Sequence, residues 1–219
     1  QIEKDLIEAI PHLTNADNSR ATAGAAKGLL ARLYLTQEKY TLAIQYANEV
    51  INSGDFTLAT DYTFYNTQNR EFLFTLVNTT ADGQVGQGFS NLTNTTARGG
   101  RGDCEFSQNL LDAFAAEPGD KRFDDLHYVE AGKTYTDKFP DGNNASDNAP
   151  VLRITELYLI RAEANLKNGA ATGASPLDDV NTLRTRAGLP NLASVDLDII
   201  LNEKRKELCF EGTRRMDLL

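Results

Sequence analysis

Side chains that commonly carry out catalysis are scarce in this 219-residue sequence. His12 and His127 are the two histidines able to act as general bases near neutral pH. The sequence contains no HExxH, GxSxG, Walker or GxGxxG motif. The acid pairs Asp124-Asp125 and Asp178-Asp179 would point about 100° apart on a helix, whereas a glycosidase needs two carboxyl groups facing one site, so we interpret them as surface or cap residues. We therefore expect a protein that is not an enzyme and uses no cofactor.

Metal-ligating patterns are also missing from the sequence. Cys104 and Cys209 form no CxxC pair, and the sequence does not decide whether they form a disulfide. We expect Cys209 to be a buried, unpaired thiol. The polar stretch Asp141–Asn148 has oxygen ligands of the kind calcium favours, but it lacks the twelve-residue calcium-loop pattern. We interpret it as a solvated turn and predict no metal site.

The last stretch of the sequence, Leu197–Leu219, combines an apolar stripe with many charged residues. Its glutamates recur every four residues, and residues four apart lie on one face of a helix. This spacing predicts an amphipathic helix whose charges form a structural network. Losing one partner from such a network, if it is buried, would cost ~3–5 kcal/mol. The predicted network residues are Glu203, Arg205, Glu207, Glu211, Arg214 and Asp217.

Residues 203–218 of this segment read EKRKELCFEGTRRMDL. The run resembles the C-terminal signature of the SusD/RagB family, including its Phe-Glu-Gly and Asp-Leu steps, with Lys204 in place of the usual Arg. That replacement keeps the charge and loses a bidentate fork. Three other blocks follow the family in order: residues 25–54, the Asp120-Lys121-Arg122 turn, and residues 152–164. The resemblance spans nearly the whole sequence.

The resemblance implies a nutrient-binding protein on the extracellular face of the cell outer membrane. Such a protein captures glycans or other nutrients and delivers them to a TonB-dependent transporter of the SusC type. Family members are normally lipoproteins anchored through an N-terminal Cys, and neither that residue nor a signal peptide opens this sequence. We expect an internal portion of a longer protein, without its anchor, its first helices and its C-terminal tail.

Composition is consistent with a globular binding protein. Hydrophobic residues make up 41% of the chain and charged residues 24%, and the net charge is −9. An acidic chain without a basic patch is unsuited to nucleic acid, and neutral ligands fit it better. No apolar run approaches the ~18 residues of a membrane span. Contact with a membrane is therefore expected only through a lipid anchor outside this chain.

Apolar periodicity predicts an all-α fold of tetratricopeptide-like helical pairs, with long irregular loop insertions and little β structure. Helices are predicted over residues 2–13, broken at Pro11, then over 21–35 and 40–53, the last ending at Gly54. The small residues between 23 and 28 would let a neighbouring helix approach closely. A second pair covers residues 152–187. Two pairs are too few for a free-standing solenoid, so we expect a single domain, 1–219, with a shared core. Its expected parts are a helical repeat (1–54), an irregular ligand-binding insertion (55–150), and a helical repeat with the signature helix (151–219).

The insertion provides the candidate ligand contacts. Residues 71–77 are predicted to form a strand, and residues 78–103 a polar, glycine-rich loop. Glycan capture needs flat aromatic faces together with amide and Arg groups, and the chain has no Trp. A core position is an equal alternative for each aromatic, with Phe64 and Phe89 expected to be buried in preference to the tyrosines. The predicted ligand-binding residues are Tyr62, Tyr65, Asn66, Phe89, Arg98, Arg101, Tyr128 and Tyr135.

Two other functions remain open at the level of sequence. A tetratricopeptide-like scaffold for protein–protein interaction, with a peptide in its groove, is the alternative. Disordered loops together with Asn and Arg on the concave helix faces would favour it. A glycan hydrolase ranks third, and release of reducing ends from a polysaccharide would be needed to support it.

Overall fold

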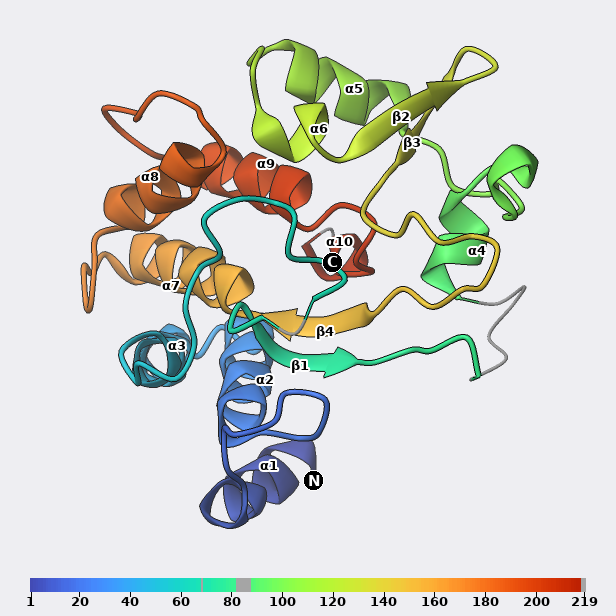
Figure 1. Ribbon diagram of the computed structural model, residues 1–219. Coiled ribbons are helices and arrows are strands. Elements are labelled where there is room, and N and C mark those ends of the chain that lie inside the picture. Colours follow the sequence, from blue (N-terminus) through green and yellow to red (C-terminus); the bar gives the residue numbers. More distant parts are fainter. Residues whose placement is uncertain (68, 82–87, 218–219) are drawn as a thin grey trace.

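The computed structural model describes residues 1–67, 69–81 and 88–217 and is mainly helical (Figure 1). Its strands form two antiparallel pairs, β1 with β4 and β2 with β3. In chain order the elements are α1 (Ile2–Ala9), the 3-10 turn η1 (Ile10–His12), α2 (Ala23–Thr36), α3 (Tyr40–Ile51), β1 (Phe72–Leu76), α4 (Phe89–Thr93), η2 (Thr96–Arg98), α5 (Gln108–Ala115), α6 (Lys121–Asp124), β2 (His127–Glu130), β3 (Lys133–Thr136), β4 (Ala149–Arg153), α7 (Ile154–Asn168), α8 (Pro176–Arg186), α9 (Leu197–Glu207) and α10 (Arg214–Asp217).

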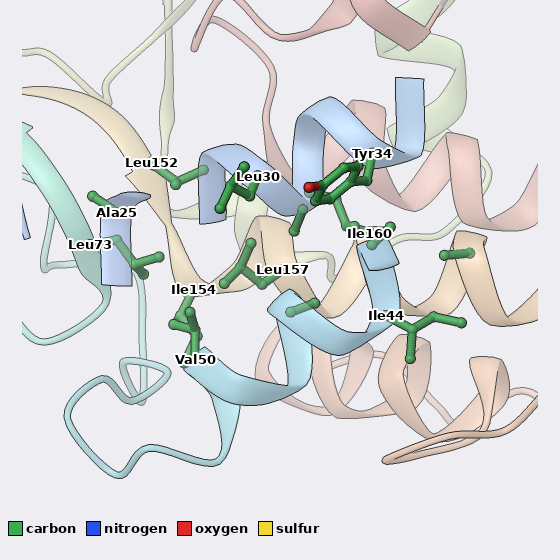
Figure 2. Close-up of a cluster of buried hydrophobic side chains, with 14 of the residues drawn as sticks. Ala25, Leu30, Tyr34, Ile44, Val50, Leu73, Leu152, Ile154, Leu157 and Ile160 are labelled. Atoms are coloured by element: carbon green, nitrogen blue, oxygen red, sulfur yellow. The ribbon is translucent and has the colours of Figure 1, made fainter. Parts of the chain in front are cut away.

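The main apolar core lies where α2, α3 and α7 pack against the β1–β4 pair. Figure 2 shows Leu30, Ile44, Leu73, Leu152 and Leu157 from these five elements converging in one cluster. Each of them is at most 3% exposed. The predicted all-α class with helical pairs and little β structure is thereby confirmed, and the helices that flank the insertion in sequence share one core.

Small residues on α2 allow the core to close, although the neighbours are not those predicted. A Cβ atom added to Gly28 would lie 2.5 Å from a methyl carbon of Leu152 and 3.0 Å from one of Leu73. A Cβ on Gly24 would lie 2.2 Å from the Phe56 ring. The close approach is therefore mainly to β4, β1 and the segment before β1, rather than to another helix.

Local signals set several helix ends. The Thr22 hydroxyl accepts a hydrogen bond from the Ala25 amide at the start of α2, and Ser175 forms a capping box with Asp178 at the start of α8. Gly169, with φ +62°, ends α7 in the left-handed conformation that glycine tolerates. The predicted start of α7 at Leu152 is wrong by two residues, because Leu152 and Arg153 pair with β1 as the end of β4.

The segment between the helical repeats is more ordered than the sequence indicated. Strand β1 was predicted, but the β2–β3 hairpin was not. The polar segment 78–103 includes helix α4 and turn η2, so the prediction of one long loop is wrong for this part. Residues 82–87 of that segment lie outside the described residues. Figure 1 shows α4 and the hairpin on the side of the molecule away from α3 and α8.

Candidate functional site

Six of the eight predicted ligand-binding residues lie around α4 and the β2–β3 hairpin. Tyr128 and Tyr135 are direct cross-strand partners, and their stacked rings have centroids 5.5 Å apart. The Arg98 guanidinium carbon lies 3.9 Å from the centre of the Tyr128 ring. Tyr128 therefore already has two stacking partners within the protein, which leaves little of its face for a sugar ring.

Arg98 and Phe89 contact the same short segment after β3. The Arg98 Nη1 donates to Asp137 Oδ1 at 2.6 Å. The Phe89 ring stacks on that of Phe139 with centroids 5.2 Å apart and planes 19° apart. Phe139 is fully buried, whereas Phe89 is 36% exposed. Within the described residues, Phe89 is the one exposed aromatic side chain, so it is the best available platform for a sugar.

The two remaining polar residues lie at the margin of α4. The backbone amide of Arg101 donates to Asn91 O at 2.7 Å, and its side chain is paired with Asp103 at the same distance. Asn66, from the segment before β1, is joined to the 141–148 turn, because its Oδ1 accepts a hydrogen bond from the Asn148 amide at 3.2 Å. Amide and guanidinium groups that could bind sugar hydroxyls are thus held by the segments next to α4, by the residues after β3 and by the 141–148 turn.

Tyr62 and Tyr65 are not on this surface. They are 2% and 3% exposed, so the expectation that the tyrosines would be more exposed than Phe89 is wrong for both, and also for Tyr135, which is 6% exposed. The Tyr62 hydroxyl donates to Glu207 Oε2 at 3.1 Å and that of Tyr65 to Glu211 Oε1 at 3.0 Å. Their phenol groups can be buried because carboxylates satisfy them.

The carboxylates of the signature helix form an extended buried charge network. Arg153 donates to Glu71 at 2.6 Å, and it lies 3.3 Å from Glu207 and 2.9 Å from Glu211. Other pairs join the same network to α6, α8 and the segment after β3: Glu203 with Arg122 and Arg184, Glu207 with Arg186, and Glu211 with Lys138. Asp217 pairs with Lys204 at 2.6 Å and lies 3.8 Å from Arg214.

This arrangement agrees with the structural role predicted for the signature residues. Burial alone would raise the pKa of Glu207, but Arg186 and Arg153 outweigh it and lower that pKa to about 2. Arg205 departs from the prediction: among the described residues it has no acidic partner, and burial together with the neighbouring Arg214 lowers its pKa. Sequence reasoning missed Glu71, Lys138, Arg184 and Arg186 as partners, because nothing in their local sequence marks them as buried.

The Asp141–Asn148 turn is packed against this surface rather than fully solvated. A Cβ on Gly142 would lie 2.3 Å from the Arg98 carbonyl oxygen. Asp147 is 7% exposed, and its Oδ2 accepts from the Asp141 amide at 2.7 Å. Burial and the nearby Asp141 carboxylate raise the pKa of Asp147 to about 6, against hydrogen bonds that lower it. The expectation of a solvated turn is therefore wrong for Asp147.

We expect Asp147→Asn to change how stability depends on pH. A raised folded-state pKa means that the protonated form favours folding, and this contribution is lost as pH rises from about 4 through 6. Water still screens part of this carboxyl group, which reduces the expected effect. Relative to the parent chain, the free energy of unfolding of Asp147→Asn should be about 1–2 kcal/mol higher at pH 7.5 than at pH 4. Urea unfolding at both pH values tests this. The same difference in unfolding free energy between variant and parent at both pH values would contradict the prediction.

Neither catalytic nor metal-binding geometry is evident in the part of the chain that the structure describes. No group of three or more His, Cys, Asp or Glu residues could hold a metal ion there. Cys104 and Cys209 are both free and half-buried. Asp178 caps α8 as expected, but Asp179 is buried 2.5 Å from Arg161. None of the described helices is long and apolar enough to cross a membrane.

Comparison with known proteins agrees with this architecture. The model of the SusD family matches residues 126–219. A SusD-like protein of Bacteroides ovatus is 26% identical over the whole chain, which covers 49% of that protein. The structure of a candidate sugar-binding protein from Bacteroides vulgatus superimposes with a TM-score of 0.88 at 25% identity, covering 98% of this chain and 51% of the other. A second structure, solved with a xylogluco-oligosaccharide, has a TM-score of 0.81 at 24% identity, and the match covers 99% of this chain and 54% of the other.

The fold and the signature network define a class: a mainly helical protein in which tetratricopeptide-like pairs share a core with an inserted, partly irregular segment. Its C-terminal part, residues 126–219, matches the SusD family model, and the whole chain is similar to SusD-like proteins. It spans about half the length of the relatives it matches.

Proposed function

We propose that this chain binds neutral glycans or oligosaccharides at the surface formed by α4, the β2–β3 hairpin and the 141–148 turn, and that it does so without catalysis. Phe89 carries the proposal. Phe89 is 36% exposed and its ring stacks on the buried ring of Phe139, while Arg98 pairs with Asp137, two residues before Phe139 in the chain. A supported aromatic face suits the apolar face of a sugar, and amide and guanidinium donors on neighbouring segments suit its hydroxyls.

Charge favours a neutral ligand over an acidic one. Arg98 is paired with Asp137 and Arg101 with Asp103, so neither guanidinium offers an uncompensated positive charge. The chain as a whole has a net charge of −9. A polyuronate or sulfated glycan would therefore be repelled at long range and would find no free cation at the surface.

For the whole protein we propose a place on the extracellular face of the outer membrane. There it would deliver its glycan to a TonB-dependent transporter of the SusC type, held by a lipid anchor outside this chain. The match of residues 126–219 to the SusD family model supports this proposal, as does the oligosaccharide with which one of the similar structures was solved. Within the chain, residues 55–150 would serve as the ligand-binding insertion, supported on the two helical parts 1–54 and 151–219.

Native gel electrophoresis in the presence of soluble polysaccharides tests the proposal. The purified chain would be run through gels that contain neutral glycans, including xyloglucan, and acidic glycans, with an unrelated protein of similar size as the mobility control. Retardation by a neutral glycan is the expected result. Retardation only by acidic glycans, or the same mobility in every gel, would contradict the proposed binding by this chain.

We expect Phe89→Ala to reduce affinity for the retarding glycan about tenfold. A stacking contact with an aromatic ring contributes about 0.5–1.5 kcal/mol beyond the apolar area it buries, and tenfold corresponds to about 1.4 kcal/mol. Isothermal titration calorimetry measures the change. Val129→Ala is the matched control, because Val129 is an apolar side chain on β2 that is 63% exposed but offers no flat face. Equal affinities of the Phe89→Ala variant and the parent chain would remove Phe89 from the site.

A further inference from the structure

A second site, separate from the surface around Phe89, lies among the helices. A cavity of about 480 Å³ opens between the C-terminal half of α2, one face of α7, and α9 with the turn that follows it. On α7 it is lined by Glu156, Ile160, Glu163 and Lys167, whose spacing places them on a single helix face. Its size is in the range of small-molecule pockets.

Each basic residue that lines the cavity in the described part of the chain is already paired with an acid. Arg32 donates to both carboxylate oxygens of Glu156, at 2.6 and 2.7 Å. The other two pairs are Lys167 with Glu163 Oε1 at 2.7 Å, and Lys204 with Asp217 at 2.6 Å. An anionic ligand would therefore have to break an existing ion pair in order to bind.

Carboxylates, in contrast, outnumber basic groups among the described residues of the cavity wall. Glu163 is only 5% exposed, yet its Oε2 has no hydrogen-bond partner among the described residues, and the nearest cation, Lys204 Nζ, is 3.6 Å away. Glu38 lines the same cavity without an ion pair in the described part of the chain. A buried carboxylate oxygen without a hydrogen-bond donor is costly, and a ligand that supplied one would relieve that cost.

Apolar side chains complete the cavity wall beside these carboxylates. Leu35, Val151, Ile160 and Leu201 come from α2, β4, α7 and α9 in turn. An aliphatic stem could pack against them while a charged head reaches the acids, which is how lysine side chains bury their methylene groups. Ammonium carries three donors and no acceptor, which matches an acceptor-rich site.

We propose that this cavity binds an alkylammonium group, such as a lysine side chain of a peptide or a free aliphatic diamine, with Glu163 Oε2 as its principal acceptor and Glu38 as a second. The site is independent of glycan binding, because its lining residues belong to α2, β4, α7, α9 and the turn after α9 rather than to α4 or the hairpin.

Titration of the isotope-labelled chain by NMR tests the proposal with three probes. These are Nα-acetyl-lysine methylamide, 1,5-diaminopentane, and the uncharged control Nα-acetyl-norleucine methylamide. We expect either ammonium probe to bind at least tenfold more tightly than the norleucine control, with shifts at Gly212 and Thr213, which line the cavity. Binding of the lysine derivative would identify a peptide side chain as the ligand, and binding of the diamine alone a free amine. Equal affinity for the norleucine control would overturn the proposal.

Matched variants link the binding to the cavity. Glu163→Gln keeps an acceptor for Lys167 but removes the charge, and we expect about a tenfold loss of affinity for the ammonium probe. Glu49→Gln removes a carboxylate paired with Lys27 outside the cavity and should change nothing. If Glu163→Gln does not fold, Glu38→Gln provides a second test, because Glu38 is exposed. This variant should bind the ammonium probe about threefold more weakly than the parent chain. Undiminished binding in a folded variant of Glu163 would overturn the assignment. Glycan retardation should be the same in all three variants, so failure here is distinct from failure of the glycan site.

Discussion

Arg153→Met should lower the free energy of unfolding by about 3–5 kcal/mol. Arg153 is 1% exposed and lies at the end of β4, where it contacts Glu71, Glu207 and Glu211. Methionine fills most of the same space but leaves three buried carboxylates short of a cation. The expected cost is the penalty of an uncompensated buried charge, not the net value of the ion pairs themselves.

Arg101→Met is the control for this substitution, because it breaks an ion pair that is exposed to water. The Arg101 side chain is 58% exposed, and its partner Asp103 is 41% exposed. Screened pairs of this kind contribute about 0–1 kcal/mol. Urea unfolding with linear extrapolation gives both values. Similar losses in the two variants would show that the network around Arg153 does not behave as a buried one.

The sequence was most informative where the governing signals are local. Apolar periodicity and glycine stop signals placed α2 and α3 within a few residues of where they occur. The start of α7 was misplaced because the run from Leu152 to Ile160 is apolar enough to suit a strand or a helix. Pairing of Phe72 with Arg153 decides that the first two residues belong to a strand. This partner is distant in sequence, so periodicity could not reveal it.

In the candidate site, too, features set by local sequence were predictable, and contacts between distant segments were not. Spacing alone indicated that Glu203, Glu207 and Glu211 would form a charge network, since their helical face is a local property. The burial of Tyr62 and Tyr65 was not predictable, because the carboxylates that accept their hydroxyl hydrogens come from the far end of the chain. Composition correctly directed attention to the insertion, but the order within it depends on packing between segments that are separate in sequence.

Phe139→Ala should combine a loss of stability with a loss of glycan binding. Phe139 is fully buried, and its ring contacts Phe89 at 5.2 Å and Tyr65 at 6.3 Å between centroids. Removing a buried phenylalanine side chain costs about 3–5 kcal/mol, as measured by urea unfolding. Because Phe139 holds the Phe89 ring in place, we also expect about the tenfold loss of affinity predicted for Phe89→Ala.

Two comparisons separate these effects. Phe89 is 36% exposed, so Phe89→Ala should lower the free energy of unfolding by only about 1 kcal/mol. Its loss of glycan affinity should nevertheless equal that of Phe139→Ala. Phe139→Leu keeps an apolar side chain in the core and should recover much of the stability lost in Phe139→Ala. Leucine lacks the flat face that orients Phe89, so calorimetry should still show weakened binding. Full affinity in the Phe139→Leu variant would mean that Phe89 needs apolar support but not an aromatic partner, and that stacking does not position the sugar platform.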